Sequence, residues 1–377
     1  MSDYTLIFVS SVFFVFLFML VLPTQGHTDP VFTVRVIYFQ PADVNDPNMP
    51  NTIRNRMEGI HEFYASEMDR HGFGRKTFRI EKDANNRIIV HTINGKHPAA
   101  HYGNAPKTHI AMQPELPAEF LNHKNANIFF VGGIKHYNNG TGGVALGVVF
   151  WGAGLNGGYA LIPTRNMAFD IVVHEVGHTF GLSHNQHRDN PDFVMGRNAG
   201  NDGFAHHEAR WLDRSSYFNH NPQLIGVLPK LTKVHPLTRV HDEISFNIDI
   251  ESPNGVHQVE IARVSDRAVI AWDYLNGQPK VTAEFEFDIE ELHGDRRVWY
   301  RIIDTQGALS QTLRDIVIPF RPRQKNPDFV DEDEKPEVTP DPKPEPKPNP
   351  EPEPKQPRIV PTRIHLTTSW ARIKKRI

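Results

Sequence analysis

The chain of 377 residues contains no cysteine. This absence excludes disulfide bonds, a lipoprotein anchor on an N-terminal cysteine and any latency that depends on a thiol. Stability must therefore come from a hydrophobic core, with bound metal as a further contribution. The chain also lacks an excess of either charge, with 41 Lys and Arg against 44 Asp and Glu. Such a balance argues against a general nucleic-acid-binding function, and no nucleic-acid partner is predicted.

Long hydrophobic runs are scarce, and one stands out at residues 6–22. The small residues Thr24 and Gly26 follow it, which is typical of a signal peptide cleaved before His27. No lysine or arginine precedes the run, and the run is long for a signal core, so an uncleaved anchor in contact with the membrane is the alternative. With residues 1–26 in either role, the sequence predicts an exported protein, extracellular or at the cell surface.

Residues 174–184 carry the strongest functional signal and read His-Glu-Val-Gly-His-Thr-Phe-Gly-Leu-Ser-His. On a helix, a spacing of four residues brings His174 and His178 to the same face, where both can bind one zinc ion. Gly181 tolerates the left-handed conformation, so the chain can leave the helix there and return His184 as the third ligand. Glu175 is placed to take a proton from a metal-bound water.

This pattern resembles the signature of the metzincin metalloproteases, His-Glu-x-x-His-x-x-Gly-x-x-His followed by a methionine turn. Met195 is the candidate for that methionine, which in the family packs beneath the metal and does not bind it. Asn185 follows the third histidine, and Arg197 stands where some families have a tyrosine. Neither residue matches a better-known subfamily, so the resemblance is to the clan as a whole. It covers roughly residues 30–222 and implies one catalytic Zn²⁺.

Other side chains compete for a role at the metal. In the gluzincin arrangement the third ligand is a glutamate farther along the chain, and Glu208 is the candidate; its alternative is a glutamate on a helix surface. His187 and the pair His206 and His207 are interpreted as neighbours of the site or surface residues. Calcium sites also occur in such enzymes, but no such site is assigned here. The available oxygen donors are Asp189, Asp192 and Asp202.

The region before the motif predicts a strand–helix–strand order. Its helix follows Pro50, presents an apolar face and stops at His71 and Gly72. This order fits a metzincin-like domain over residues 27–225, with a twisted mixed sheet and helices packed on it. Strands are predicted at residues 31–39, 77–81, 88–93 and 128–131, and further helices at 167–178 and 204–217. The apolar face of the first helix comprises Ile53, Met57, Ile60, Tyr64 and Met68.

Two glycine-rich segments, residues 142–151 and 157–163, predict a pair of strands just before the metal motif. In metzincins the corresponding edge strand bounds the cleft and pairs with an extended peptide substrate through main-chain hydrogen bonds. The alternative is an ordinary hairpin that contains glycine. An extended protein or peptide is therefore the expected partner.

The pattern of polar and apolar residues in the sequence changes at about residue 228. Short alternating strands separated by turn signals predict a β-sandwich over residues 228–322, resembling an immunoglobulin-like or fibronectin-type module. Its sequence shows no group of residues typical of a catalytic site. Its predicted role is that of a spacer, or of a module that binds the substrate or a surface. Strands are expected at residues 243–250, 256–264, 269–274, 281–289, 298–303 and 315–320.

The C-terminal part is not predicted to form a domain. Residues 331–357 hold proline at nearly every second position, which favours an extended polyproline spacer. Residues 358–377 form a basic tail, either an amphipathic helix that touches an anionic surface or a solvated tail.

The predicted fold class is α+β, a metzincin-like domain followed by an all-β sandwich. The leading function is a secreted or surface-exposed zinc endopeptidase, with His174, His178 and His184 as ligands and Glu175 as general base. Two alternatives remain open: a non-catalytic surface adhesion or binding protein on a metalloprotease scaffold, and metal-dependent hydrolysis of a non-peptide bond.

Overall fold

The structure, a computed structural model, describes residues 32–103, 107–121, 125–135, 144–147, 158–185, 193–196, 202–219, 227–295, 297–311 and 316–318. These residues all belong to one compact unit with mixed α and β structure, which confirms the α+β class. No helix in these ranges combines the length and hydrophobicity of a membrane span. The predicted export segment, proline-rich spacer and basic tail lie outside the described residues, and the predicted domain boundaries stay predictions.

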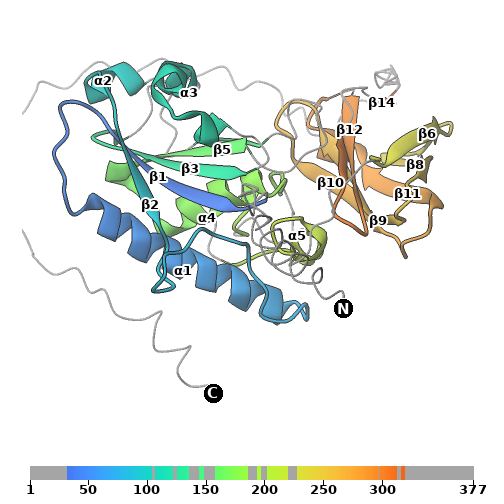
Figure 1. Cartoon of the computed structure of the whole chain (residues 1–377). Coiled ribbons are helices and arrows are strands. Elements are labelled where there is room, and N and C mark those ends of the chain that lie inside the picture. Colours follow the sequence, from blue (N-terminus) through green and yellow to red (C-terminus); the bar gives the residue numbers. More distant parts are fainter. Residues whose placement is uncertain are drawn as a thin grey trace, which may run out of the picture. The chain divides into compact units, whose positions relative to one another are not determined.

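The first sheet has the strand order β2-β1-β3-β5-β4 in the described chain (Figure 1). Four of its strands are parallel, whereas β4 pairs antiparallel with β5 at the sheet edge. The predicted pair of strands before the metal motif is therefore confirmed. The bounds are β1 Val34–Gln40, β2 Val90–Asn94, β3 Ala126–Val131, β4 Val144–Gly147 and β5 Gly158–Pro163.

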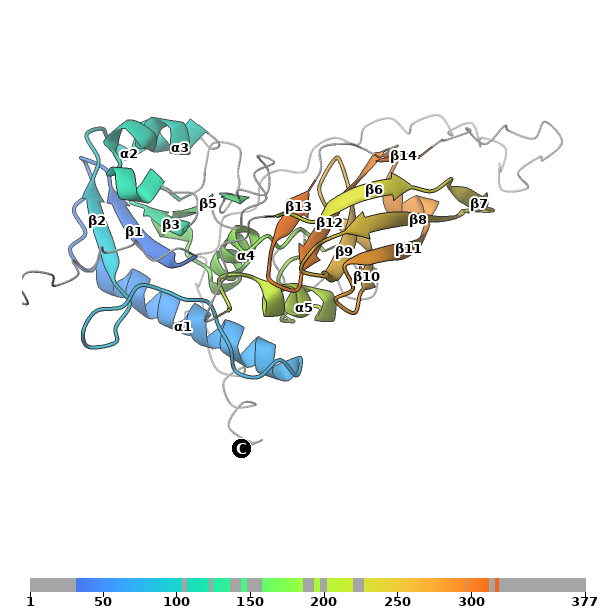
Figure 2. The same cartoon turned by 45° about the vertical axis from the view of Figure 1, so that its right-hand side comes forward.

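Both faces of this sheet are covered, because successive side chains of a strand point to opposite faces. Val36 and Tyr38 of β1 pack in one core with helices α1 and α4, whereas Ile37 and Phe39 pack in a second core with α2 and α3. Figures 1 and 2 show α1 on one side of the sheet and α2 with α3 on the other. The predicted apolar face of α1 is confirmed, since all five of its residues are buried.

The helices are α1 Met49–Arg70, α2 Ala99–Tyr102, α3 Lys107–Met112, α4 Phe169–Thr179 and α5 His206–Arg214. Short 3-10 turns lie at Gln113–Glu115, Ala118–Leu121, Thr164–Asn166 and Ile289–Leu292. Pro50 lies in the first turn of α1, and His71 caps its C-terminal end. The predicted helices around the motif and after it are therefore present, but α4 and α5 begin about two residues later than expected.

The predicted strand at residues 77–81 is wrong. Only Ile80 forms an isolated bridge there, with Val34 of β1. The segment is instead tied to the chain after α5: the Arg79 main-chain N–H donates to the Tyr217 carbonyl, and its guanidinium donates to the carbonyl of Ser216. The segment also bonds β1, since the Val34 N–H donates to the Arg79 carbonyl and the Glu81 N–H donates to the Val34 carbonyl, but this pairing does not extend into a strand.

The second half of the unit is a β-sandwich of two antiparallel sheets around a shared apolar core. One sheet has the order β10-β9-β12-β13 with β14 on β12; the other has β11-β8-β6 with β7 on β8. The closer resemblance to immunoglobulin-like or fibronectin-type modules stays a prediction. The bounds are β6 Lys230–Val234, β7 Thr238–Val240, β8 Glu243–Glu251, β9 Val256–Arg263, β10 Val269–Tyr274, β11 Lys280–Asp288, β12 Arg297–Asp304, β13 Leu309–Gln311 and β14 Ile316–Val317.

The two sheets differ in what covers their outer faces. In β8 buried residues alternate with more exposed ones, as expected for a strand with one solvated face. Strand β9 is buried along its whole length. Its inward residues Val259 and Ile261 join the sandwich core, whereas the Gln258 amide donates to the His207 carbonyl of α5. The β9 sheet therefore packs against the part of the chain that carries the metal motif.

Candidate metal centre

Helix α4 presents two of the three motif histidines. It begins at Phe169, after Pro163 and a 3-10 turn, and buries Val172, Val173 and Val176 in the core it shares with α1. The helix also contacts the edge strands β4 and β5. His174 and His178 lie one turn apart on its remaining face, as the spacing predicts.

The end of α4 turns the chain toward the third histidine. Gly181 has φ +84°, the left-handed conformation that favours glycine, and the Leu182 N–H donates to the Gly177 carbonyl. This turn closes the helix and brings His184 beside His174 and His178. The conformation predicted for Gly181 is confirmed.

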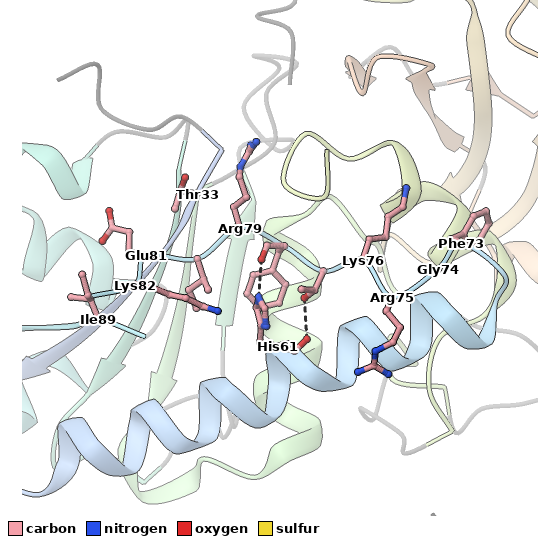
Figure 3. Close-up of a pocket in the computed structure, with 13 residues that line it drawn as sticks. Thr33, His61, Phe73, Gly74, Arg75, Lys76, Arg79, Glu81, Lys82 and Ile89 are labelled. Carbon is pink, nitrogen blue, oxygen red and sulfur yellow. Dashed lines mark hydrogen bonds between the residues drawn. The ribbon is translucent and has the colours of Figure 1, made fainter. Parts of the chain in front are cut away.

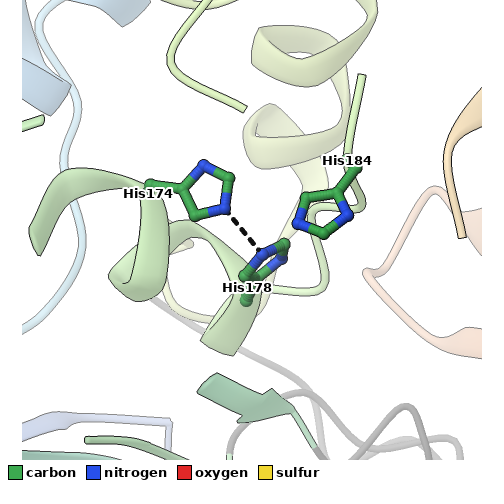
Figure 4. Close-up of side chains that lie close together, drawn as sticks. All are labelled: His174, His178 and His184. Carbon is green, nitrogen blue, oxygen red and sulfur yellow. Dashed lines mark hydrogen bonds between the residues drawn. The ribbon is translucent and has the colours of Figure 1, made fainter. Parts of the chain in front are cut away.

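The three histidines converge (Figure 4). One ring nitrogen from each lies within 4.8 Å of the other two. The Nε2 atoms of His174 and His178 are 3.1 Å apart. Two nitrogens bound to zinc at tetrahedral angles would be about 3.3 Å apart. His174 is buried, while His178 and His184 are partly exposed, so a metal held here would be reachable from solvent.

The second nitrogen of each ring fixes its orientation. The Nδ1 atoms of His174, His178 and His184 lie 2.7, 2.8 and 3.1 Å from the carbonyl oxygens of Val194, Leu182 and Asp266, respectively. A carbonyl oxygen only accepts, so each Nδ1 carries the proton and each neutral ring keeps a lone pair on Nε2. The facing lone pairs of His174 and His178 repel each other unless a cation lies between them. This donor set fits a divalent metal such as zinc.

The electrostatics keep the helical histidines neutral. Burial lowers the pKa of His174 to about 4 and the pKa of His178 well below its usual value. The carbonyl of Val194 opposes this effect at His174, but burial is the larger cause. Neutral imidazole is the form that binds a metal, so no proton needs to be displaced at neutral pH.

Met195 lies against the helix between the two ligand positions. It is fully buried, and a Cβ placed on Gly177 would come within 2.6 Å of its sulfur. The Met195 carbonyl accepts the main-chain N–H of Asn185, directly after the third histidine. Gly177 is a site residue that the sequence did not reveal, because the motif allows any residue at this position. Glycine has no side chain, and this leaves room for Met195.

The carboxylates near the motif occupy different environments. Glu175 is buried on α4 beside His174. Glu208 lies at the start of α5, where its carboxylate accepts the Ala205 N–H at 2.8 Å. Burial raises the pKa of Glu208 to about 8. Glu208 therefore caps α5, and it is not part of the histidine cluster in the described residues.

The remaining candidates do not join the three histidines in the described chain. His206 is exposed and stacks on Phe73, while His207 stacks on Trp272 of β10. Asp202 is exposed. The other residues considered lie outside the described ranges, namely His187, Asp189, Asp192 and Arg197.

Two sandwich residues at the site were not anticipated. Asp266 supplies the carbonyl that accepts the proton of His184 Nδ1, and Arg301 donates to the carbonyl of Gly181. They lie 82 and 120 positions from their partners. No local pattern in the sequence could connect residues so far apart.

A groove of about 1060 Å³ lies elsewhere, between α1 and residues 73–82 (Figure 3). Three of its cationic side chains already have partners: Arg75 pairs with Glu62, Lys76 pairs with Asp213, and Arg79 donates to main-chain carbonyls. The three motif histidines are not among its lining residues. The chemistry is therefore assigned to the histidine cluster.

Comparisons with known proteins support the fold. No family model matches the chain, and no curated protein matches its sequence. Two structures of wild-type OgpA from Akkermansia muciniphila match at 19% identity, with TM-scores of 0.55 and 0.56, covering 76% and 77% of this chain and 96% and 95% of theirs. Catalytically inactive OgpA in complex with an O-glycopeptide substrate, glycodrosocin, matches at 19% identity and TM-score 0.56, covering 76% and 95%. The shared fold spans both halves of the unit.

Proposed function

We propose that the protein is an exported zinc endopeptidase of the metzincin type. The observation that carries this proposal is the convergence of His174, His178 and His184, each with its Nδ1 proton held by a carbonyl and Nε2 left for a metal. Zinc held by His174, His178 and His184 would supply a Lewis acid for this chemistry.

Glu175 is the side chain proposed to transfer the proton. Glu175 accepts a proton from the attacking water as the water oxygen bonds to the scissile carbonyl carbon. When the carbon–nitrogen bond breaks, Glu175 returns that proton to the leaving amine. Glu175 is 9% exposed, so bulk water has little access to this carboxylate.

The substrate is an extended peptide. Strand β4 lies at the edge of the sheet and contacts α4, so a peptide added to that edge would run beside the histidines. OgpA, which shares the fold, has been captured with an O-glycopeptide substrate. Peptides that carry O-glycans are therefore the first substrate class to test.

The test uses the full chain and two matched peptides, one O-glycosylated and one bare, with and without a chelator. We expect cleavage that depends on zinc, and Glu175→Gln should keep zinc while losing about 10²–10⁴-fold in turnover. Metal content measured on the same samples separates loss of base from loss of metal. Full activity in Glu175→Gln would refute the role of the base; a zinc-loaded chain that cleaves neither peptide favours the non-catalytic binding protein.

A further inference from the structure

The segment that carries the third histidine is held by the β-sandwich. The main-chain N–H of Val269, at the start of β10, donates to the His184 carbonyl at 2.9 Å. The Asp266 carbonyl accepts the Nδ1 proton of the same histidine at 3.1 Å. Asn185 also forms a parallel bridge with Val269. The backbone and the ring of His184 are thus both bonded by residues 266–269, which lead from β9 into the start of β10.

The turn that makes these contacts is held by hydrogen bonds of its own. The Asp266 carboxylate accepts two hydrogen bonds from the Arg263 guanidinium, at 2.9 and 2.7 Å, and one from the Ala268 N–H at 3.2 Å. The Arg263 side chain is fully buried. Because the carboxylate holds both ends of the turn, it also fixes the direction of the Asp266 carbonyl.

A second contact from the sandwich reaches the turn before His184. Arg301 of β12 donates to the Gly181 carbonyl, pairs with Glu260 of β9 at 3.1 Å, and lies 4.5 Å above the Trp211 ring of α5. Arg301 and Glu260 are each only 3% exposed. Arg301 therefore connects β12 to the turn that leads from α4 to His184.

We propose that the β-sandwich is part of the metal centre: Asp266 is a positioning residue that holds His184 in place as the third ligand. This inference rests on the proposed function only in taking His184 as a metal ligand. It replaces the expectation that the sandwich serves as a spacer or a binding module. Partners of metal-bound histidines typically change metal affinity by about 10–100-fold when removed.

The test measures Zn²⁺ affinity of the full chain by competition with a chelator, without reference to peptide cleavage. Asp266→Ala keeps the carbonyl that bonds His184 but loses the carboxylate that holds the turn, so we expect it to bind zinc about 10-fold more weakly, at the low end of that range. Asp266→Asn keeps an oxygen for the Ala268 N–H and should recover most of the affinity. In a His184→Ala background, Asp266→Ala should cause no further loss. Asp249→Ala is the matched control, because this sandwich carboxylate also accepts hydrogen bonds but contacts β11 and His235.

Wild-type affinity in folded Asp266→Ala, or an equal loss with and without His184, would overturn the proposal. Circular dichroism and the urea midpoint establish folding. If Asp266→Ala does not fold, Asp266→Ser takes its place, because its hydroxyl is too short to accept the hydrogen bonds of Arg263 and Ala268 together. A wild-type chain that binds zinc without cleaving peptides would refute the proposed peptidase alone. A chain that cleaves peptides while Asp266 has no effect would refute the positioning role alone, and a chain that binds no zinc would refute both.

Discussion

His174 and His178 depend on one helix, whereas His184 depends on two halves of the molecule. The helical pair is set by a spacing of four residues and by the packing of α4 against α1 and the sheet. The third histidine reaches the site through a left-handed turn at Gly181 and is held by Asp266 and Val269 of the sandwich. The first arrangement is local in sequence, and the second requires the whole unit to fold.

This difference has a consequence for how the metal couples to stability. A metal bound by all three histidines links α4 to the segment that the sandwich holds. Zinc should therefore stabilise both halves together, and changes in the sandwich should alter metal binding mainly through His184.

Loss of a helical ligand should have the largest effect. At a free zinc concentration 1,000-fold above Kd, binding adds about 4 kcal/mol to the free energy of unfolding. We expect His178→Ala to abolish this increment, because the remaining pair binds too weakly to saturate under those conditions. Urea unfolding with and without zinc measures the increment. His206→Ala, an exposed histidine outside the cluster, is the control and should keep it in full.

Gly177→Ala tests the packing beneath the helical pair. The new Cβ would lie 2.6 Å from the Met195 sulfur and 3.2 Å from the Tyr64 hydroxyl. Overpacking of this kind costs about 1–3 kcal/mol of unfolding free energy. Met195→Ala in the same chain should recover part of that loss, as a double-mutant cycle in urea would show. Strictly additive effects would mean that Met195 is not what limits the space at Gly177.

The helical half of the site could be predicted from the sequence, because helix geometry converts a spacing directly into a shared face. Gly181 was predictable for the same reason, since its conformation follows from the end of the helix. Gly177 was not, because its meaning depends on Met195, which reaches it from a separate turn. Asp266 and Arg301 could not be predicted either, because nothing in the sequence of the sandwich distinguishes them from other charged residues near a turn or on a strand.

The fold shows the same division. The apolar face of α1 and the alternation in β8 are local periodicities, and both appear as predicted. The expected strand at residues 77–81 is reduced to a bridge at Ile80, and Arg79 bonds residues near 217, which no local pattern encodes. Strand β9 reads as an ordinary sandwich strand, yet its polar residue Gln258 is buried against α5.

Acid should weaken the contact between the sandwich and α5 through His257. Burial, followed by the nearby Arg210 guanidinium, lowers the pKa of this histidine to about 4. Its pKa in the unfolded chain is about 6.5, so between pH 6.5 and 4 the unfolded chain binds more protons and stability falls as the pH falls. At pH 5 the loss is about 2 kcal/mol. The buried histidines His174 and His178 add a pH dependence of the same sign in a chelator. The difference between the urea midpoints at pH 7 and pH 5 should therefore shrink in His257→Gln by the contribution of His257, and an unchanged difference would contradict the shift.

Gly181→Ala should have the smallest effect and should act on the side of His184. At φ +84° an alanine costs about 1 kcal/mol relative to glycine, because its Cβ crowds the following carbonyl. We expect that loss in urea together with a modest weakening of zinc binding, since the turn leads directly to the third ligand. Gly181→Asn is the matched control, because asparagine tolerates the left-handed region and should lose less in both measurements. Equal losses in the two variants would indicate that the contact with Arg301, and not the backbone conformation, limits this turn.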